Sequence, residues 1–269
     1  MVTKKAANTF KPRPQAPAGK VVALQRGLDV LACFEAQRRA LGHAELARLT
    51  GLPKPTLSRM LTTLKEAGFL RLDAGTEKYS LGPRVVALAN IYISSFDIRA
   101  LARPLMQVLA DRTGLSVYLA IAVDLDMLII EVARPPSSML VTRLDIGSRV
   151  PMSTSALGRA YLLDLEDGAR LALLKRMEKT YGSSWASAKI NIESSLRKSK
   201  RLGYCQSLGE LYPDIHSIAK AIRLPTGETV VLNCGGPSNY LSPQMITRSA
   251  APALLETVDK LRKSTGQKN

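Results

Sequence analysis

The stretch that decides the fold is GLPKPTLSRMLTTLKEAGFL, from Gly51 to Leu70, an amphipathic segment with two prolines near its start. Leu57, Leu61 and Leu64 recur at helical spacing and therefore predict one buried stripe on a helix. The first turn of a helix tolerates proline because its N–H groups have no helical partner, so the two prolines mark the start. Cationic and hydroxyl side chains occupy the opposite face. The pattern predicts a helix whose N-terminal end meets an anion.

The segments on either side of this helix predict a winged helix-turn-helix. A shorter segment with Leu46 and Leu49 inward precedes it, and Gly51 ends that segment with a residue that tolerates positive φ. Two helices joined by a tight glycine turn are the helix-turn-helix layout. Two alternating runs, 69–72 and 78–81, follow and are joined by DAGTE, which is a hairpin signal. A plain three-helix packing unit is the alternative.

An earlier helix is predicted over residues 21–36, where apolar residues recur at the 3.6-residue spacing of a helix packed on one side. Its predicted inward residues are Leu24, Leu28, Leu31 and Ala32.

The order of helices and hairpin, together with the local positive charge, predicts a DNA-binding surface. In this motif the N-terminal residues of the second helix contact base edges. Arg59 is expected to pair with guanine through two donors, whereas Lys54 is expected to contact phosphate. Arg71 and Lys78 flank the hairpin and are also expected to lie on phosphates. The predicted DNA-binding residues are Lys54, Thr56, Ser58, Arg59, Thr62, Arg71 and Lys78.

Charge and composition limit the classes of binding partner and the cellular compartment that we expect. The formal net charge is +16 over 269 residues, and residues 1–82 carry half of the excess, with 14 Lys/Arg against 6 Asp/Glu. Such a density favours nucleic acid over a membrane, the alternative being a generally solvated basic surface. No apolar run is long enough to span a membrane, and residues 1–19 are predicted to be a disordered basic tail rather than a secretory signal. Three scattered cysteines suggest neither disulfides nor a metal site, so a reducing cytoplasm is expected and no cofactor.

A linker helix and a second domain are predicted after the hairpin. Residues 83–96 place apolar side chains near one helical face, which either pairs with another chain or packs onto its own domain. Further along, strands interleaved with helices predict an α+β domain. One of these strands is predicted over 137–147, and a single last helix over 243–262.

Three blocks of the sequence resemble the IclR-type bacterial transcriptional regulators. They are ELARLTGLPKPTLSRMLTTLKEAGFLRLD with EKYSLGPRVVALA, then GSRVPMSTSALGRAYL, then RLGYCQSLGE with IAKAIRLPTGETVVLNCGGP. The resemblance covers about residues 20–262. It implies an α+β chain with a winged helix-turn-helix, a linker helix and a GAF-like effector-binding domain. Family members act as dimers or tetramers, bind double-stranded DNA operators, and repress or activate catabolic genes in response to small metabolites, commonly carboxylates or aromatic acids.

The domain boundaries follow from the motifs and the resemblance together. The expected order is a basic tail over 1–19, a DNA-binding domain over 20–82, a linker helix over 83–100, an effector-binding and oligomerisation domain over 101–262, and a tail over 263–269.

The segment MSTSALGRAYLL, residues 152–163, offers hydroxyls for capping a helix whose free N–H groups suit a small carboxylate. An ordinary capped helix is the alternative from the residues alone. The resemblance places effector-binding residues at Ala156, Leu157, Ser207, Ser217, Asn233 and Gly235. Ser207, Ser217 and Asn233 depart from the acidic, cysteine and serine residues that the family often has there, so the charge and hydrogen bonding of the pocket differ. His216 is expected to be either structural or a ligand contact.

A small-molecule-processing enzyme with a fused nucleic-acid-binding module is the competing class. The sequence has no GxSxG, P-loop, HExxH or Rossmann glycine pattern, so the chain is predicted not to be an enzyme. A nucleoid-type DNA binder that ignores ligands would need no second domain. The prediction is therefore a cytoplasmic homo-oligomer that binds an operator and a small organic effector, without a cofactor or a membrane.

Overall fold

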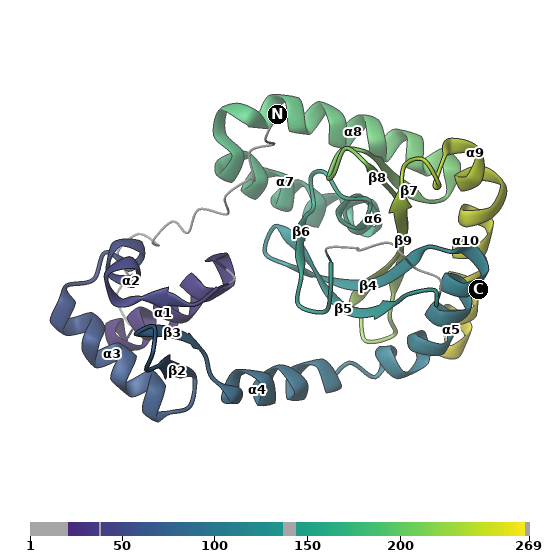
Figure 1. Ribbon diagram of the computed structural model, residues 1–269. Coiled ribbons are helices and arrows are strands. Elements are labelled where there is room, and N and C mark those ends of the chain that lie inside the picture. Colours follow the sequence, from purple (N-terminus) through teal and green to yellow (C-terminus); the bar gives the residue numbers. More distant parts are fainter. Residues whose placement is uncertain (1–20, 38, 137–143, 267–269) are drawn as a thin grey trace. The chain divides into compact units, whose positions relative to one another are not determined.

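The computed structural model describes residues 21–37, 39–136 and 144–266, which form two compact units divided between Ser95 and Phe96. The N-terminal unit contains α1 (Val22–Gln37), β1 (Leu41–Gly42), α2 (His43–Thr50), α3 (Lys54–Glu66), β2 (Leu70–Asp73), β3 (Lys78–Leu81) and α4 (Pro83–Ser94) (Figure 1). The tail predicted over 1–19 lies outside the described residues.

One apolar core holds the three helices and the small sheet of the N-terminal unit together. Leu46 of α2 and Leu57 and Leu61 of α3 are fully buried, as their spacing predicts. They meet Val30 and Phe34 of α1 in this core. Strand β3 pairs antiparallel with both β2 and β1, so the wing is a three-stranded sheet rather than a plain hairpin.

The buried face of α1 differs from the predicted one. Leu24 and Leu28 are 62% and 51% exposed, whereas Val30, Cys33 and Phe34 are buried. The spacing did not distinguish the two faces because both carry apolar residues at helical intervals. The buried residues of α1 all lie in its second half.

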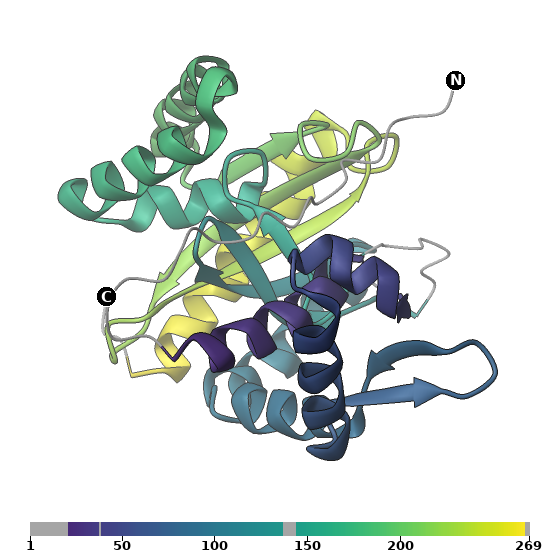
Figure 2. The same cartoon turned by 90° about the vertical axis from the view of Figure 1, so that its left-hand side faces the viewer.

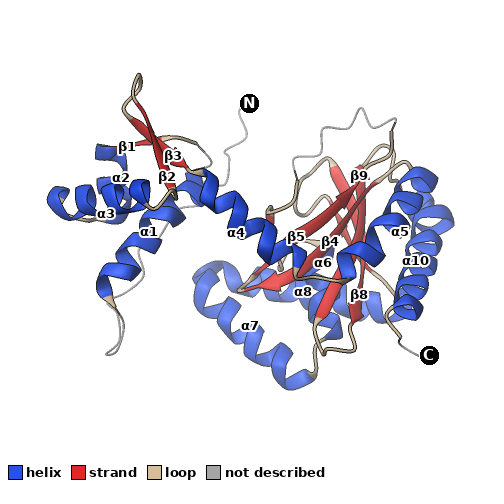
Figure 3. Cartoon of the chain, turned by 90° about the horizontal axis from the view of Figure 1, so that it is seen from below, coloured by secondary structure: helices blue, strands red, loops and turns tan. Residues whose placement is uncertain are grey.

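The C-terminal unit is an antiparallel six-stranded sheet with helices on both faces (Figure 3). Its elements are α5 (Ile98–Thr113), β4 (Ser116–Val123), β5 (Asp126–Ala133), β6 (Arg149–Pro151), α6 (Ala156–Asp164), α7 (Asp167–Tyr181), α8 (Trp185–Leu202), β7 (Cys205–Leu208), β8 (Ile215–Arg223), β9 (Thr229–Pro237), α9 (Pro243–Met245) and α10 (Ala251–Ser264). The strand order is β6-β5-β4-β9-β8-β7. Helices α5 and α10 cover one face, and α6, α7 and α8 share a core with the other.

Strand alternation separates the two cores of this unit. In β4, Val117 and Leu119 pack with α5 and α10, whereas Tyr118 and Ala120 pack on the α6 side. Successive side chains of a strand point to opposite faces, so each central strand serves both helical layers. Side chains that lie on the α6 side therefore come from alternate positions of neighbouring strands.

The α+β fold with an N-terminal helix-turn-helix and a C-terminal sheet domain is confirmed, with local differences. The stretch predicted as a linker helix over 83–100 is not continuous, because α4 ends at Ser94 and α5 begins at Ile98. The strand predicted over 137–147 lies partly outside the described residues, and 144–147 form a loop and turn. The last helix, predicted as one piece, starts with α9 and a π-helical turn over Ile246–Ala250 before α10.

The length and hydropathy of the helices show whether any of them could cross a membrane. Within the described ranges, no single helix is long and apolar enough to cross a membrane, and α4 and α5 qualify only as a pair bent by 85°.

Gly82 joins β3 to α4 at a point where the backbone is crowded. A Cβ atom on Gly82 would lie 2.3 Å from the carbonyl oxygen of Gly68. We expect Gly82→Ala to lower the free energy of unfolding by about 1–3 kcal/mol, because the backbone must shift to admit the methyl group. Gly27, inside α1, serves as the control, since a Cβ atom added there would have no neighbouring atom within 4 Å. Gly27→Ala should be neutral or stabilising by about 0.5–1 kcal/mol. Denaturant unfolding followed by circular dichroism measures both, and equal stabilities would contradict the crowding argument.

Candidate functional site

The outward face of α3 carries the helix residues predicted to contact DNA. Lys54, Ser58, Arg59 and Thr62 are exposed, and Thr56 is half-buried. The buried leucines of α3 hold the opposite face in the core, so this face is rigidly presented to solvent. Its hydroxyl and cationic groups are of the kinds that bind phosphates and base edges.

The N-terminal end of α3 has N–H groups without side-chain caps. The helix begins at Lys54 after Pro53, and no side chain accepts a hydrogen bond from its first turn. Such N–H groups form an anion site. The Oγ of Ser58 lies 3.0 Å from Nε2 of His43, the first residue of α2. His43 therefore adds an imidazole to this end of the surface, which helical spacing within α3 alone did not indicate.

The wing presents its two predicted phosphate contacts on one face. Arg71 pairs with Ser80 across the hairpin and Lys78 pairs with Asp73, so all four residues share a face of the sheet. Nε of Arg71 donates a hydrogen bond to Oγ of Ser80 at 2.8 Å. Figure 2 shows the β2–β3 hairpin extending from the helices of its unit.

The turn of the wing is fixed by one carboxylate. Oδ1 of Asp73 accepts hydrogen bonds from Oγ1 and from the backbone N–H of Thr76 at 2.8 and 2.7 Å. These bonds to the Thr76 hydroxyl and N–H lower the pKa of the Asp73 carboxyl below its usual value. Asp73 therefore remains ionised beside Lys78 near neutral pH.

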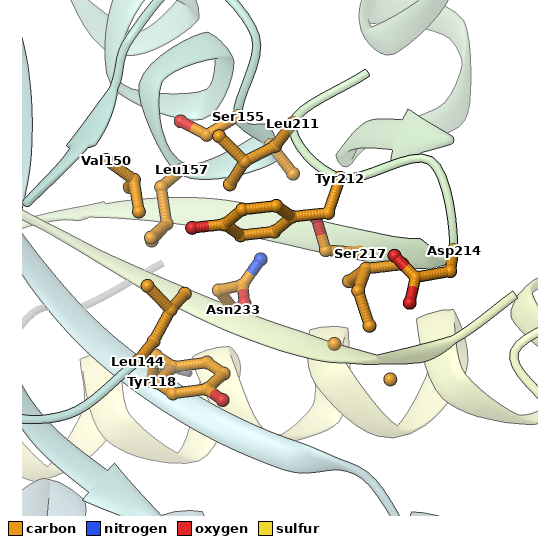
Figure 4. Close-up of a pocket in the computed structure, with 14 residues that line it drawn as sticks. Tyr118, Leu144, Val150, Ser155, Leu157, Leu211, Tyr212, Asp214, Ser217 and Asn233 are labelled. Carbon is orange, nitrogen blue, oxygen red and sulfur yellow. The ribbon is translucent and has the colours of Figure 1, made fainter. Parts of the chain in front are cut away.

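A pocket opens in the C-terminal unit between the sheet, the start of α6 and the loop over 209–214 that joins β7 to β8 (Figure 4). It encloses about 850 Å³ of empty space, its open mouth included. Five of the six predicted effector residues line it, namely Ala156, Leu157, Ser217, Asn233 and Gly235.

The register of three strands brings the sheet residues of the pocket together. Ser217 of β8 lies opposite Gly235 of β9, and Tyr118 of β4 lies opposite Asn233 of β9. These pairs alternate with residues that face the other core. The side-chain amide of Asn233 donates from Nδ2 to the carbonyl oxygen of Ile218 at 2.9 Å, which fixes its orientation.

Ser207 is the one predicted effector residue that does not line the pocket. Its side chain is buried, and its Oγ donates a hydrogen bond to the carbonyl oxygen of Thr154 at 2.7 Å. Ser207 thereby ties β7 to the residues that precede α6. His216 is also outside the lining residues, and its Nδ1 lies 2.8 Å from the carbonyl oxygen of Leu241, which favours its structural alternative.

The start of α6 is a capped helix end that faces the pocket. Oγ of Ser155 accepts from the N–H of Gly158 at 3.0 Å and donates to the carbonyl oxygen of Pro151 at 2.7 Å. The N–H groups of Ala156 and Leu157 begin the helix and have no acceptor one turn earlier within it. A Cβ atom on Gly158 would lie 2.1 Å from Cα of Met152, so only glycine allows the helix to approach this closely.

The charge of the pocket limits what it can hold. Among its described lining residues there is no lysine, arginine or histidine, and the Asp214 carboxylate is the one group with a formal charge. The helix N-terminus is therefore the positive end of the pocket. A single carboxylate fits at Ala156 and Leu157, whereas a second one near Asp214 would be repelled. Tyrosine, leucine and isoleucine side chains suit an apolar or aromatic body.

The pattern of the sequence did not reveal the contribution of the 209–214 loop. Leu211, Tyr212 and Asp214 line the pocket from this loop, and Tyr118 lines it from β4. Figure 4 shows the Tyr212 ring directed across the pocket toward Leu157 and Asn233. The signal that was available is an aromatic residue in a short loop rich in glycine and proline, since such loops carry binding residues.

The three thiols give no support to covalent catalysis. Cys33, Cys205 and Cys234 are buried. Burial raises the pKa of the Cys33 thiol to about 11, with the Asp29 carboxylate adding to the effect, and burial also raises that of Cys205 to about 11. Burial raises the pKa of Cys234 as well. Because the thiolate is the nucleophilic form, these side chains are unreactive near neutral pH. In the part of the chain that the structure describes, no group of three His, Cys, Asp or Glu side chains is placed to hold a metal ion.

Known proteins match both units in order. The family profile for the IclR helix-turn-helix domain matches residues 23–74, and that for the C-terminal domain of bacterial transcriptional regulator IclR matches residues 90–263. The HTH-type transcriptional regulator TsaQ1/TsaQ2 of Comamonas testosteroni is 33% identical over 247 residues, covering 91% of this chain and 88% of the relative. The acetate operon repressor of Salmonella typhimurium is 25% identical and covers 87% of this chain and 86% of the relative.

Solved structures share the same architecture. An IclR family transcriptional regulator from Brucella abortus is 35% identical, with a TM-score of 0.80, covering 91% of this chain and 93% of the other. An IclR homologue from Microbacterium hydrocarbonoxydans, solved in complex with 4-hydroxybenzoate, is 20% identical with a TM-score of 0.73, covering 91% of this chain and 99% of the other. At this lower identity the likeness is one of fold.

Proposed function

Because this chain belongs to the IclR family of bacterial transcriptional regulators, we propose that α3 and the wing bind an operator and that a small organic acid in the pocket changes this binding. The observation that carries the proposal is the pocket itself, whose positive end is the start of α6 and whose other described lining residues are uncharged or acidic. The genes under control are those of catabolism of that acid, and the chain acts in the bacterial cytoplasm, where its DNA lies.

Operator recognition is divided between reading and anchoring residues. Arg59, exposed on α3, reads a guanine through two donors, and Thr56, Ser58 and Thr62 contact bases or phosphates near it. Lys54, Arg71 and Lys78 anchor the unit on phosphates. Lys54 is the first residue of α3, so its charge adds to that of the free N–H groups at the end that meets a phosphate in this proposal.

The chain works as a homo-oligomer, a dimer or a tetramer, in this proposal. Leu88 and Tyr92 of the predicted apolar face of α4 are 50% and 47% exposed, and Val86 and Ile91 elsewhere on the helix are 62% and 70% exposed. The sequence left open whether the apolar face packs on its own domain or on another chain. Exposed apolar side chains gathered on one helix support the second alternative, since exposed apolar patches mark interaction sites. A dimer also presents two wings to the two halves of a palindromic operator.

The ligand acts by differential affinity for two arrangements of the oligomer. A ligand shifts such an equilibrium only when it binds one arrangement more tightly than the other. The competing function, an enzyme acting on the pocket's ligand, lacks a favouring observation because the lining offers neither a reactive thiol nor a histidine among the described residues. Ligand-dependent DNA binding without turnover is therefore the proposed activity.

Truncation of Arg59 and truncation of Lys54 are expected to weaken DNA binding in different ways. Arg59→Ala should weaken operator binding by about 1–3 kcal/mol and relax the base preference at one position, because a bidentate contact to guanine is lost. Lys54→Ala should weaken binding to every sequence alike and reduce the slope of log K against log salt by about 0.9.

The measurement is fluorescence anisotropy on an operator selected from random DNA and on single-base variants of it, at several salt concentrations. Lys65→Ala removes an exposed cation from the other end of α3 and is the matched control, expected to leave base preference unchanged. An unaltered base preference in Arg59→Ala would contradict the assignment of Arg59 as a residue that reads a base directly.

The pocket is expected to prefer monocarboxylates over dicarboxylates. In a thermal-shift comparison, 4-hydroxybenzoate should raise the melting temperature and benzene-1,4-dicarboxylate should not, because Asp214 opposes a second negative charge. At 100 times its Kd, a ligand specific for the native state stabilises by about 2.7 kcal/mol. A preference for the dicarboxylate would contradict the charge argument.

A bulky side chain at Ala156 should abolish the ligand response and leave DNA binding intact. Ala156 lines the pocket at the helix start, so the side chain in Ala156→Met fills the space for the carboxylate. Ala172→Met, on the exposed side of α7, is the control for the same change of size. Thermal shift with ligand and anisotropy with operator DNA measure the two properties. A ligand response that survives Ala156→Met would place the binding site elsewhere.

A further inference from the structure

Arg159 is a buried cation in the first turn of α6, directly behind the helix start that lines the pocket. Its side chain is 2% exposed. Nη1 donates to the carbonyl oxygen of Gln206 at 3.0 Å and to Oε1 of Glu210 at 2.7 Å. Nη2 contacts the other carboxylate oxygen of Glu210 and lies 3.4 Å from the carbonyl oxygen of Ser153. The guanidinium is therefore held by two backbone carbonyls and neutralised by a bidentate carboxylate.

Glu210 belongs to the 209–214 loop, and its partner is in a different element. The loop contributes three pocket residues, Leu211, Tyr212 and Asp214, while Glu210 itself is not among the lining residues. The loop is a tight one, because Gly209 has a φ of +79° and its N–H donates to the carbonyl oxygen of Ile215 at 3.1 Å. The Arg159–Glu210 pair thus joins the loop to the first turn of α6.

We propose that the Arg159–Glu210 ion pair holds the 209–214 loop in place over the pocket and so sets the affinity for the effector without touching it. The reason is the burial of Arg159. If the loop moves away, the guanidinium stays buried without its carboxylate, which is strongly unfavourable. The loop therefore keeps Tyr212 and Leu211 in position before the ligand arrives. Less free energy is then spent on ordering the loop when the ligand binds.

This proposal rests on the proposed function, since it concerns the same pocket. The alternative role for the pair is general stability of the C-terminal unit. The two roles differ in where the structure loosens. A positioning pair affects the 209–214 loop and ligand affinity, whereas a merely structural pair affects the whole sheet and the melting temperature.

The test compares two variants of the full chain with wild type. Glu210→Gln keeps the size of the side chain and removes its charge. The double variant Arg159→Met with Glu210→Gln removes both charges, so no unpaired buried charge remains and the fold should tolerate it. Glu228→Gln, an exposed carboxylate on the turn between β8 and β9, is the control for the same chemical change.

Hydrogen–deuterium exchange without ligand reports on the loop. Both variants should exchange the amides of residues 209–215 about tenfold faster than wild type, with the central strands β4 and β9 unchanged. The double variant should keep a melting temperature near that of wild type. Affinity for 4-hydroxybenzoate should fall about tenfold in both variants and stay unchanged in Glu228→Gln.

Three results overturn the proposal or a part of it. One is unchanged exchange of residues 209–215 in both variants. Another is faster exchange throughout the sheet with a lowered melting temperature in the double variant, which marks a structural pair. Faster loop exchange with unaltered 4-hydroxybenzoate affinity also overturns the link to affinity. A wild-type protein that does not bind 4-hydroxybenzoate counts against the aromatic-acid function, and the exchange measurement still decides whether the pair holds the loop.

Discussion

The pairing of β9 with β4 on one side and β8 on the other is the constraint on which the effector unit depends. It places Asn233 beside Tyr118 and Gly235 beside Ser217, all on the face that α6 covers. A shift of one residue in this register turns every side chain to the opposite face. The apolar residues that alternate with them, such as Val117 and Leu232, fill the second core and so resist such a shift. The pocket is thus kept in place by the packing on the far side of the sheet.

The N-terminal ends of α6 and α3 share one physical feature that serves two different purposes. Both begin with N–H groups that lack a helical partner, and both follow residues whose conformation ends the preceding segment. At α3 the end is exposed beside cations and suits a polyanion. At α6 it is buried beside apolar side chains in a pocket, so it suits a single small anion. The surroundings, rather than the helix end, decide the ligand.

The features that depend on residues close in sequence could be predicted, and those that depend on distant pairs could not. The winged unit followed from helical spacing and turn residues close in sequence, and Leu46, Leu57 and Leu61 are buried as expected. The inward face of α1 was not predictable in this way, because Leu24 and Val30 both fit a helical stripe and only tertiary contacts choose between them. The pocket depends on pairs distant in sequence, such as Ser207 with Thr154 and Arg159 with Glu210, which periodicity does not show. The departure from the family at Ser207 consequently concerns the support of α6 rather than the lining.

The division of the pocket between sheet and loop has a consequence for how such sensors diversify. The anion end is made of backbone N–H groups and lies beside Gly158, where a side chain would collide with the backbone of Met152, so that glycine cannot vary without disrupting the fold. A second wall comes from a six-residue connection whose Tyr212 and Asp214 line the pocket, while its Leu211 also packs against the core on the α6 side. In the proposed pocket, substitution of Tyr212 or Asp214 would therefore change which body of an acid is accepted, while the start of α6 would keep the contact to its carboxylate.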